Sequence, residues 1–309
     1  MIVTVTMNPA FDKVLTVPKL VPGSLNRVRC GPLVPSGKGI NVARVIHAWN
    51  YPVTAVALAG EGFERFGSFL TDCGVEHRLI NVPGEIRTNI KLIEEQSGVM
   101  TELNEPGPVI GEAAIGKLKS ELMRHCYQAE VVVLSGSLPP GVPAEFYEDL
   151  TRELNGYGVR VVVDASGPAM RHALKGSLFA IKPNRVEAQE ILGAKDQPDT
   201  LLMQQLQELG ACHAILSLGS QGAYFAYGDH TLWAIPPRVR VANPAGAGDT
   251  LLATYLVGVL SGWSFRDCVA RATAAAAATV RDLGGGVAGP ADVRDFVDRV
   301  RIESMKQGS

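Results

Sequence analysis

The residues best suited to chemistry lie in one short stretch, Asn243–Thr250, where two glycines precede a carboxylate. Gly246 and Gly248 flank Ala247, Asp249 follows, and an apolar segment with helical spacing begins directly afterwards. The first turn of a helix has unpaired backbone N–H groups and the positive end of the helix dipole, which favours an anion. Asp249 could therefore act as an acid or base beside a bound anion, or it could simply cap the helix.

A second glycine-rich turn, Pro35–Asn41, also precedes a predicted helix and contains Lys38 between Gly37 and Gly39. It is not a Walker phosphate loop, because Gly39 rather than Ser or Thr follows the lysine. The Asn243–Thr250 stretch likewise lacks the third glycine of the dinucleotide fingerprint. Phosphate contacts are therefore expected from helix N-termini and from separate cations.

The strand predicted for Ile86–Leu92 provides such cations. Arg87, Asn89 and Lys91 stand at alternate positions and so share one face. Two cations two positions apart suit a phosphate ester, which arginine can bind through two parallel hydrogen bonds. The alternative is a solvated face of an edge strand. The two glycine-rich turns favour the phosphate interpretation.

Short β-branched runs alternate with amphipathic stretches along most of the chain, which predicts βαβ units and a parallel sheet covered on both faces. The predicted strands are Ile2–Met7, Val53–Leu58, Val131–Leu134, Val159–Val163, Phe179–Ile181 and Ala214–Leu218. The predicted helices are Gly39–Trp49, Phe63–Cys73, Gly111–Cys126, Pro143–Asn155, Arg185–Leu192 and Leu201–Leu209.

Two regions interrupt this alternation. Phe11–Pro35 is expected to form short extended pieces joined at Pro18, at Pro22-Gly23 and at Gly31-Pro32, and Ile86–Leu103 to form a hairpin. Together they predict a small β-sheet that stands off the main sheet, although an ordinary surface excursion is the alternative. We expect one domain over residues 1–309, with the small sheet built from about residues 11–35 and 86–104.

Polar residues follow five of the predicted strands directly. In open parallel sheets, ligands bind outside the carboxyl ends of the strands. A polar cleft is therefore expected along that edge, lined by Asn8, Ser135–Ser137, Asp164, Lys182–Asn184, and Ser217 with Gly219.

Composition excludes several classes of function. The net charge is -2 with no basic run, so neither nucleic acid nor an anionic membrane is an expected partner. The chain opens directly on a strand pattern, no apolar run is long enough to span a bilayer, and the histidines lack zinc-ligand spacing. The five scattered cysteines indicate free thiols in a reducing cytoplasm.

Eight segments, taken in order, resemble the ribokinase-like (PfkB) carbohydrate kinases from Met1 to about Pro290: TVTMNPAFD, PSGKGINVARV, RTNIKL, TELNEPGP, LSGSLPPG, IKPNRVE, SLGSQGA and NPAGAGDT. The first three look most similar to the branch that acts on phosphorylated ketohexoses. Ser36 stands where many members have Gly or Ala, and Ala245 and Thr250 stand where Val and Ser are common. These differences bear on the substrate rather than on the chemistry.

The resemblance implies an α/β fold with a doubly wound, mostly parallel sheet flanked by helices, and a β-sheet lid. It also implies transfer of the γ-phosphoryl group of ATP to a sugar hydroxyl. Asp249 would be the base, and the backbone N–H groups of Gly246, Ala247 and Gly248 would face the transferring group. Lids of relatives pair between subunits, so a homodimer through the lid is expected.

The remaining site residues follow from the same resemblance. Mg²⁺ would be held through water by Asn184 and Glu187. The nucleotide site would comprise Lys182, Asn184, Ser217, Gly219 and Gly222. The sugar would be bound by Asp12, Gly37, Lys38 and Asn41, and its existing phosphate by Arg87 with help from Asn89 and Lys38.

Among possible sugars, fructose 1-phosphate is favoured over tagatose 6-phosphate and fructose 6-phosphate, because the Gly-Lys-Gly-Ile-Asn and Arg-Thr-Asn segments look closest to that group. Two other classes stay open at this point. One is a sugar-phosphate binding protein without catalysis, which the complete Gly-Ala-Gly-Asp and Asn-x-x-Glu segments argue against. The other is a nucleotide-binding dehydrogenase, which the missing fingerprint argues against.

Overall fold

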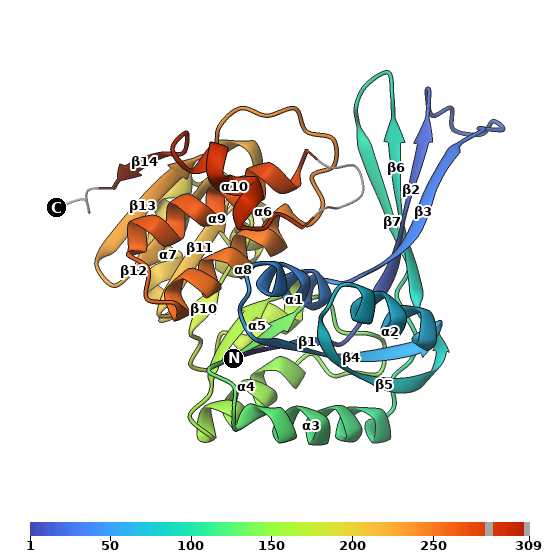
Figure 1. Cartoon of the computed structure of the whole chain (residues 1–309), viewed down its shortest axis with the longest axis horizontal. Helices are drawn as coiled ribbons and strands as arrows, with labels where there is room; N and C mark the ends of the chain where they lie inside the picture. Colours follow the sequence, from blue (N-terminus) through green and yellow to red (C-terminus); the bar gives the residue numbers. More distant parts are fainter. Residues whose placement is uncertain (282–286, 306–309) are drawn as a thin grey trace.

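The computed structural model describes residues 1–281 and 287–305. Within these residues a ten-stranded sheet has the order β14-β13-β12-β11-β10-β9-β8-β1-β4-β5 (Figure 1). Neighbours from β5 to β11 pair in parallel, whereas β12, β13 and β14 continue the sheet in antiparallel pairs. The strands are β1 (Ile2–Thr6), β4 (Val53–Glu61), β5 (Glu76–Glu85), β8 (Val131–Ser135), β9 (Arg160–Asp164), β10 (Ala180–Ile181), β11 (His213–Ser217), β12 (Ala223–Tyr227), β13 (His230–Ile235) and β14 (Arg301–Ser304).

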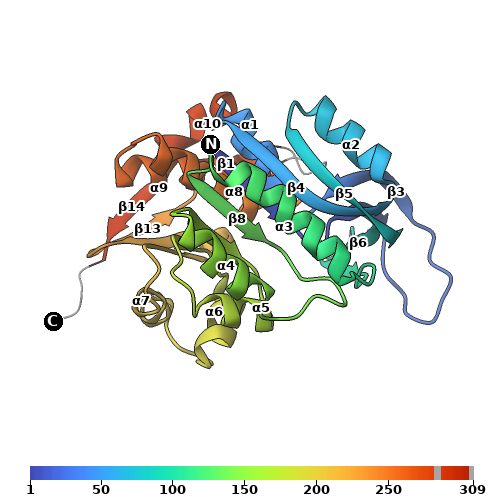
Figure 2. The same ribbon diagram turned by 90° about the horizontal axis from the view of Figure 1, so that it is seen from below.

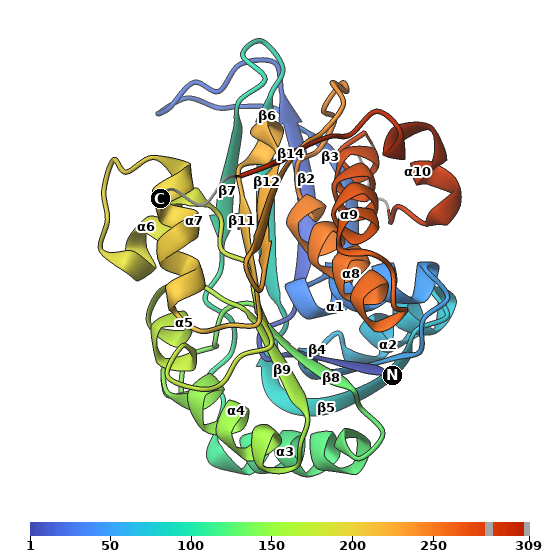
Figure 3. The same cartoon turned by 90° about the vertical axis from the view of Figure 1, so that its left-hand side faces the viewer.

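Helices cover both faces of this large sheet, as Figures 2 and 3 show. One face carries α1 (Lys38–Ala48), α2 (Phe63–Asp72), α8 (Ala247–Leu260), α9 (Phe265–Thr279) and α10 (Pro290–Val297). The other carries α3 (Glu112–Cys126), α4 (Phe146–Gly156), α5 (Gly167–Ala173), α6 (Arg185–Leu192) and α7 (Asp199–Glu208). The predicted α/β fold is confirmed, and each predicted helix corresponds to one of these.

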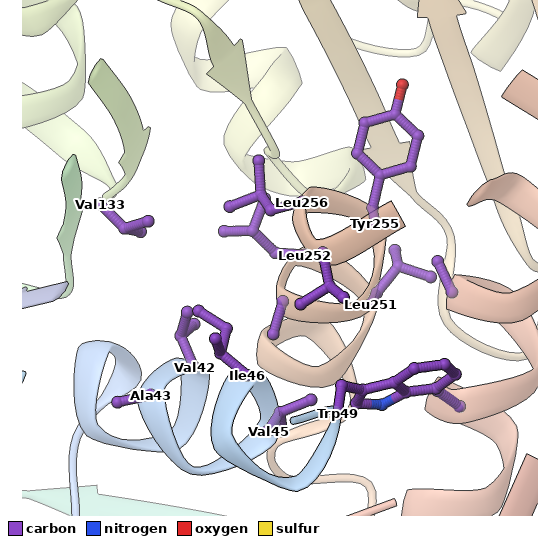
Figure 4. Packing of buried hydrophobic residues seen from close by; sticks show 14 of the residues in the cluster. Val42, Ala43, Val45, Ile46, Trp49, Val133, Leu251, Leu252, Tyr255 and Leu256 are labelled. Carbon is purple, nitrogen blue, oxygen red and sulfur yellow. The ribbon is translucent and has the colours of Figure 1, made fainter. Parts of the chain in front are cut away.

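The hydrophobic core is divided in two because successive strand residues point to opposite faces. In β1, Ile2 packs in the cluster beneath α1 and α8, whereas Val3 packs in the cluster beneath α3 and α4. Figure 4 shows the first cluster, where Val42 of α1 lies near Leu252 and Leu256 of α8. Each such buried side chain contributes about 1.5–3 kcal/mol. The two helices that begin at the glycine-rich turns are therefore packed rigidly against each other.

The small sheet has the order β3-β2-β6-β7 and projects from the body of the molecule (Figure 1). Its strands are β2 (Ala10–Val17), β3 (Arg29–Ser36), β6 (Arg87–Glu94) and β7 (Met100–Asn104). The prediction of a small separate sheet is confirmed. β3 is one strand through Gly31-Pro32, where the sequence predicted a junction between two extended pieces. The junction takes the form of a bulge in β3, because Gly31 and Pro32 together stand opposite Val14 between the pairs Lys13–Leu33 and Leu15–Cys30.

Candidate active site

Helix α8 begins in the middle of the Asn243–Thr250 stretch. Gly246 is its N-cap and has φ of 80°, a left-handed conformation that favours glycine. Asp249 therefore lies in the first turn rather than at the cap, and it makes no capping hydrogen bond. Its Oδ2 instead accepts a hydrogen bond of 2.8 Å from Nδ2 of Asn41. Asp249 is buried, with a relative exposure of 7%. This geometry removes the capping interpretation and leaves a carboxylate held by the other glycine-rich turn.

That other turn is built on Gly37 and Gly39. Gly37 is the N-cap of α1 with φ of 142°, and a Cβ atom there would lie 3.0 Å from the methyl group of Thr6. A Cβ on Gly39 would lie 2.4 Å from the hydroxyl of Thr6. The start of α1 can pack this closely on β1 because both positions lack side chains. The close packing places Asn41, in the first turn of α1, beside Asp249.

A buried carboxylate, Asp164, holds two lysines at the end of β9. Its Oδ1 lies 2.9 Å from Nζ of Lys38 and 3.4 Å from Nζ of Lys182. Asp164 is fully buried and Lys182 almost so. A Cβ on Gly248 would lie 3.2 Å from Nζ of Lys182, so this ammonium group borders the first turn of α8. The two lysines thus bring positive charge to the place where the helix N-terminus already favours an anion.

The charges of this cluster shift one another's pKa values. Burial raises the pKa of Asp249 above its ordinary value; Lys38 opposes this shift and Asp164 adds to it. Burial alone would also raise the pKa of Asp164, but Lys182 and Lys38 lower it below its ordinary value. For Lys38, burial acts to lower the pKa, yet Asp164 and Asp249 raise it overall. The cluster therefore holds a firmly charged Lys38 and an Asp249 that is a stronger base than an ordinary aspartate.

The small sheet contributes a second polar group. Asp12 of β2 stands opposite Asn89 of β6, whose Nδ2 donates to Oδ1 of Asp12 over 3.1 Å. Nζ of Lys91 lies 2.5 Å from Oδ2 of the same carboxylate. Asn89 and Lys91 therefore do share a face, and the charge of Lys91 is directed at Asp12.

Arg87 lies on the same strand but has other partners. Its Nε and Nη2 donate to the carbonyl oxygen of Asn8, and its Nη1 donates to that of Glu105. Burial lowers the pKa of Arg87, and the carboxylates of Asp12 and Glu105 oppose that shift. Three of the five N–H donors of its guanidinium are thus engaged with backbone carbonyl groups. The role of Arg87 in phosphate binding stays a prediction.

The residues predicted for the nucleotide and Mg²⁺ lie at the ends of β10 and β11. Asn184 and Glu187 form a capping box at the start of α6, in which each side chain accepts the other's backbone N–H. Ser217 donates to the carbonyl oxygen of Pro183. Gly219 has φ of 59° in open space, and a Cβ on Gly222 would lie only 1.9 Å from the carbonyl oxygen of Ala234. Gly222 therefore permits a close approach of two strands, and its contact with a nucleotide stays a prediction.

A cavity of about 320 Å³ lies between the small sheet and the first turns of α1 and α8. Three predicted site residues line it, namely Asp12, Asn41 and Gly246. Lys91, which the sequence placed on the same strand face as Arg87, lines it as well, and so does Arg44, which the sequence did not assign to the site. The cavity is therefore large enough for a sugar and extends to the start of α8.

Two residues of this site were missed from the sequence. Asp164 was recognised as a polar strand end, but its position gave no sign that it binds two lysines. Arg44 follows Asn41 by three positions and so lies on the same helical face, which was the available signal.

Within residues 1–281 and 287–305, no group of three metal-ligating His, Cys, Asp or Glu side chains is present. In the same part of the chain, no helix has the length and apolar character required to cross a bilayer.

This arrangement, an α/β sheet with a buried carboxylate at a helix N-terminus, defines an enzyme suited to group transfer onto a hydroxyl. The chain belongs to the pfkB family of carbohydrate kinases, whose model matches residues 5–291. It is accordingly a sugar kinase that uses ATP as substrate and transfers phosphate to a hydroxyl group.

Relatives cover nearly the whole chain. A 1-phosphofructokinase from Xanthomonas campestris pv. campestris is 32% identical over 312 residues, which is 98% of each chain. The crystal structure of phosphofructokinase-2 from Escherichia coli in complex with potassium is 29% identical, with a TM-score of 0.87 over 96% of this chain and 98% of that one. A tetrameric inhibited form of the same kinase is similar at 28% identity and a TM-score of 0.86, over the same shares.

Proposed function

We propose that this kinase phosphorylates fructose 1-phosphate with ATP, giving fructose 1,6-bisphosphate and ADP. The observation that carries the proposal is the hydrogen bond between Asn41 and Asp249 beside a sugar-sized cavity. It joins the turn predicted to bind the sugar to the carboxylate predicted to act as base.

In the proposed reaction, Asp249 accepts the proton of the attacking hydroxyl group, which its raised pKa favours. The hydroxyl oxygen attacks the γ-phosphorus of ATP, and the bond to the β,γ-bridging oxygen breaks. The backbone N–H groups of Gly246, Ala247 and Gly248 stabilise the charge on the transferring group. Lys182 lies next to Gly248 and supports the phosphates of ATP.

Asp12, Gly37, Lys38 and Asn41 form the proposed sugar site, and Arg87 and Asn89 the proposed site of the existing phosphate. For ATP we propose Lys182, Asn184, Ser217, Gly219 and Gly222. The oxygen atoms of Asn184 and Glu187 suit Mg²⁺ held through water, because hard cations prefer oxygen ligands. Bound Mg²⁺ would neutralise charge on the phosphates of ATP.

The small sheet is the proposed lid, since its residues Asp12 and Lys91 line the cavity. Closure of the lid would exclude water, which otherwise competes as acceptor. Pairing of two lids in a homodimer is part of the proposal, and a related kinase is known in a tetrameric form. We place the enzyme in the cytoplasm, where its five cysteines would stay reduced.

The decisive experiment compares fructose 1-phosphate, tagatose 6-phosphate and fructose 6-phosphate in one ADP-coupled assay. The highest kcat/KM is expected for fructose 1-phosphate, and a higher value for either other sugar would reassign the substrate.

Asp249→Asn is the matched test of the chemistry. It should lower kcat by about 10²–10⁴-fold while sugar-phosphate affinity stays nearly unchanged. Unaltered turnover would refute the assignment of the base.

A further inference from the structure

The guanidinium group of Arg185 joins three elements at the edge of the sheet where the nucleotide is proposed to bind. Arg185 is the first residue of α6, and its Nε and Nη2 donate to Oδ1 and Oδ2 of Asp199, the first residue of α7, over 2.7 and 2.6 Å. Nη2 also donates to Oε1 of Gln221 over 2.6 Å. Gln221 belongs to the turn that follows β11, so one side chain ties the starts of two helices to that turn.

The turn Gly219–Gly222 is held from two sides through Gln221. It closes on itself through the N–H group of Leu218, which donates to the carbonyl oxygen of Gly222 over 2.8 Å. Gly219 stands in open space, and Gln221 is exposed. The indole Nε1 of Trp233 on β13 donates to the backbone carbonyl of Gln221 over 3.2 Å, while Arg185 holds its side chain. The contact with Arg185 therefore links this turn directly to α6.

The same end of α6 carries the residues proposed to hold Mg²⁺. Asn184 and Glu187 form the capping box there, on either side of Arg185 in the chain. The N–H group of Ser217 donates to the carbonyl oxygen of Pro183 over 3.0 Å, so β11 ends beside this capping box. The proposed metal ligands and the nucleotide turn are thus joined by the backbone at the end of β11 and, further along the turn, by the side chain of Arg185.

The pair of Arg185 and Asp199 contributes orientation more than stability. Their side chains have relative exposures of 41% and 24%, and solvent screens an ion pair at such positions. A forked arginine–carboxylate pair nevertheless fixes the plane of the guanidinium group, because two parallel hydrogen bonds leave it little freedom to rotate. Asp199 therefore holds Arg185 in the direction of Gln221.

We propose that Arg185 is a positioning residue for ATP: through Gln221 it holds the turn Gly219–Gly222 against the capping box at the start of α6. The turn and the capping box then meet the phosphates of one ATP molecule and its Mg²⁺ in a prearranged geometry, which lowers the entropic cost of binding. The inference rests on the proposed function for the place of the nucleotide. It adds Arg185, Gln221 and Asp199, which lie outside the set assigned above to ATP.

The test is a double-mutant cycle of Arg185→Met, Gln221→Met and the double variant, which remove the donor, the acceptor and both. The matched control is Arg152→Met, because Arg152 on α4 also binds a carboxylate at 2.6 Å, that of Glu148, outside the site. KM for ATP and KM for the sugar phosphate are measured separately, with whichever of the three sugar phosphates gives the highest kcat/KM. The affinity for ATP with Mg²⁺ is also measured by calorimetry, which does not depend on turnover.

Arg185→Met and Gln221→Met should each raise KM for ATP about 3- to 10-fold, while kcat changes less and KM for the sugar phosphate stays constant. The double variant should rise no further than the larger single effect, because the same contact is lost in all three. Arg185→Lys, which keeps the charge without the planar fork, should be intermediate, and Arg152→Met unchanged. Equal rises in KM for ATP and for the sugar phosphate, or single effects that multiply in the double variant, would overturn the inference.

Hydrogen exchange separates this inference from the proposed function. In the wild type, ATP should slow exchange of the backbone amides of Gly219–Gly222, and without ATP these amides should exchange faster in Arg185→Met. If ATP protects the turn but Arg185→Met changes neither the exchange nor the ATP affinity, the inference fails and the nucleotide site stands. If ATP gives the turn no protection, the proposed nucleotide site fails and the inference fails with it. If none of the three sugar phosphates is a substrate, the proposed function fails, and ATP affinity in the same variants still decides the inference.

Discussion

Replacing Asp164 by Asn removes one negative charge from the centre of the cluster and leaves its shape nearly unchanged. In the wild type, Oδ1 of Asp164 binds the ammonium groups of both Lys38 and Lys182. The neutral amide would still accept a hydrogen bond but would no longer balance either charge. Lys38 is partly exposed and can be hydrated, whereas Lys182 has a relative exposure of 4%.

The loss of stability should therefore come mainly from Lys182. Leaving one partner of a buried ion pair uncompensated costs about 3–5 kcal/mol, and the hydration open to Lys38 favours the lower end, about 3 kcal/mol. The substitution also acts on Asp249, because Asp164 contributes to the rise of its pKa. With that charge removed and two lysines less neutralised, the pKa of Asp249 should fall.

Two measurements separate these effects: the free energy of unfolding in urea, and the acid limb of kcat/KM against pH. Asp164→Asn should lower both the free energy and the pH of the acid limb, and kcat should fall because the lysines are no longer held. Glu148→Gln is the control, since Glu148 is also buried and pairs with Arg152, His172 and Lys175 outside the site. It should lose stability without moving the acid limb. An acid limb that stays in place or rises in Asp164→Asn would refute the electrostatic reasoning.

In the wild type, the acid limb of kcat/KM should lie above the range of an ordinary aspartate, because burial raises the pKa of Asp249; a limb at or below that range would contradict its assignment as base. Burial lowers the pKa of His213 to about 4, so unfolding stability that is complete above about pH 6.5 should fall by about 3 kcal/mol as the pH drops to 4. His213→Gln should flatten this dependence in urea titrations at several pH values, and an unchanged slope would show that another group is responsible. Gly222→Ala should lower the free energy of unfolding by more than about 2 kcal/mol, because the added Cβ would meet the carbonyl group of Ala234. The control Gly219→Ala adds a Cβ in open space and should cost about 1–2 kcal/mol, because Gly219 has a left-handed backbone conformation. Equal losses of stability in the two variants would argue against the close approach.

The elements that were predicted correctly have strong local signals. The buried run Val131–Ser135 and the amphipathic pattern of α3 each reveal their type within a few residues. Strand β5 was not predicted, because it lies at the sheet edge, has exposed residues at half of its positions and contains Pro83 and Gly84. Such a strand is defined by its pairing with β4, which a local pattern does not contain.

The residues of the candidate site likewise differ in whether a local sequence pattern reveals them. The helix start at Gly246 is a local property, which the two glycines before Asp249 and the apolar segment after it indicate. The partner of Asp249 is 208 residues away, and the two lysines of Asp164 come from α1 and from the end of β10. The rule that ligands bind at the carboxyl ends of parallel strands could place these residues along one edge of the sheet. It could not tell which pairs touch, because that depends on how α1 packs on β1.

The contacts also explain why the centre of the site contains glycine rather than further cations. Before substrates bind, Asp164 pairs with both Lys38 and Lys182 and so offsets part of the positive charge that they bring to this place. The additional positive potential must come from the N-terminus of α8, whose N–H groups need no side chain. Gly248 provides them and leaves room for Lys182, since a Cβ there would lie 3.2 Å from Nζ. An alanine at this position would require Nζ of Lys182 to shift by a few tenths of an ångström, which would loosen the contact between this ammonium group and the helix end.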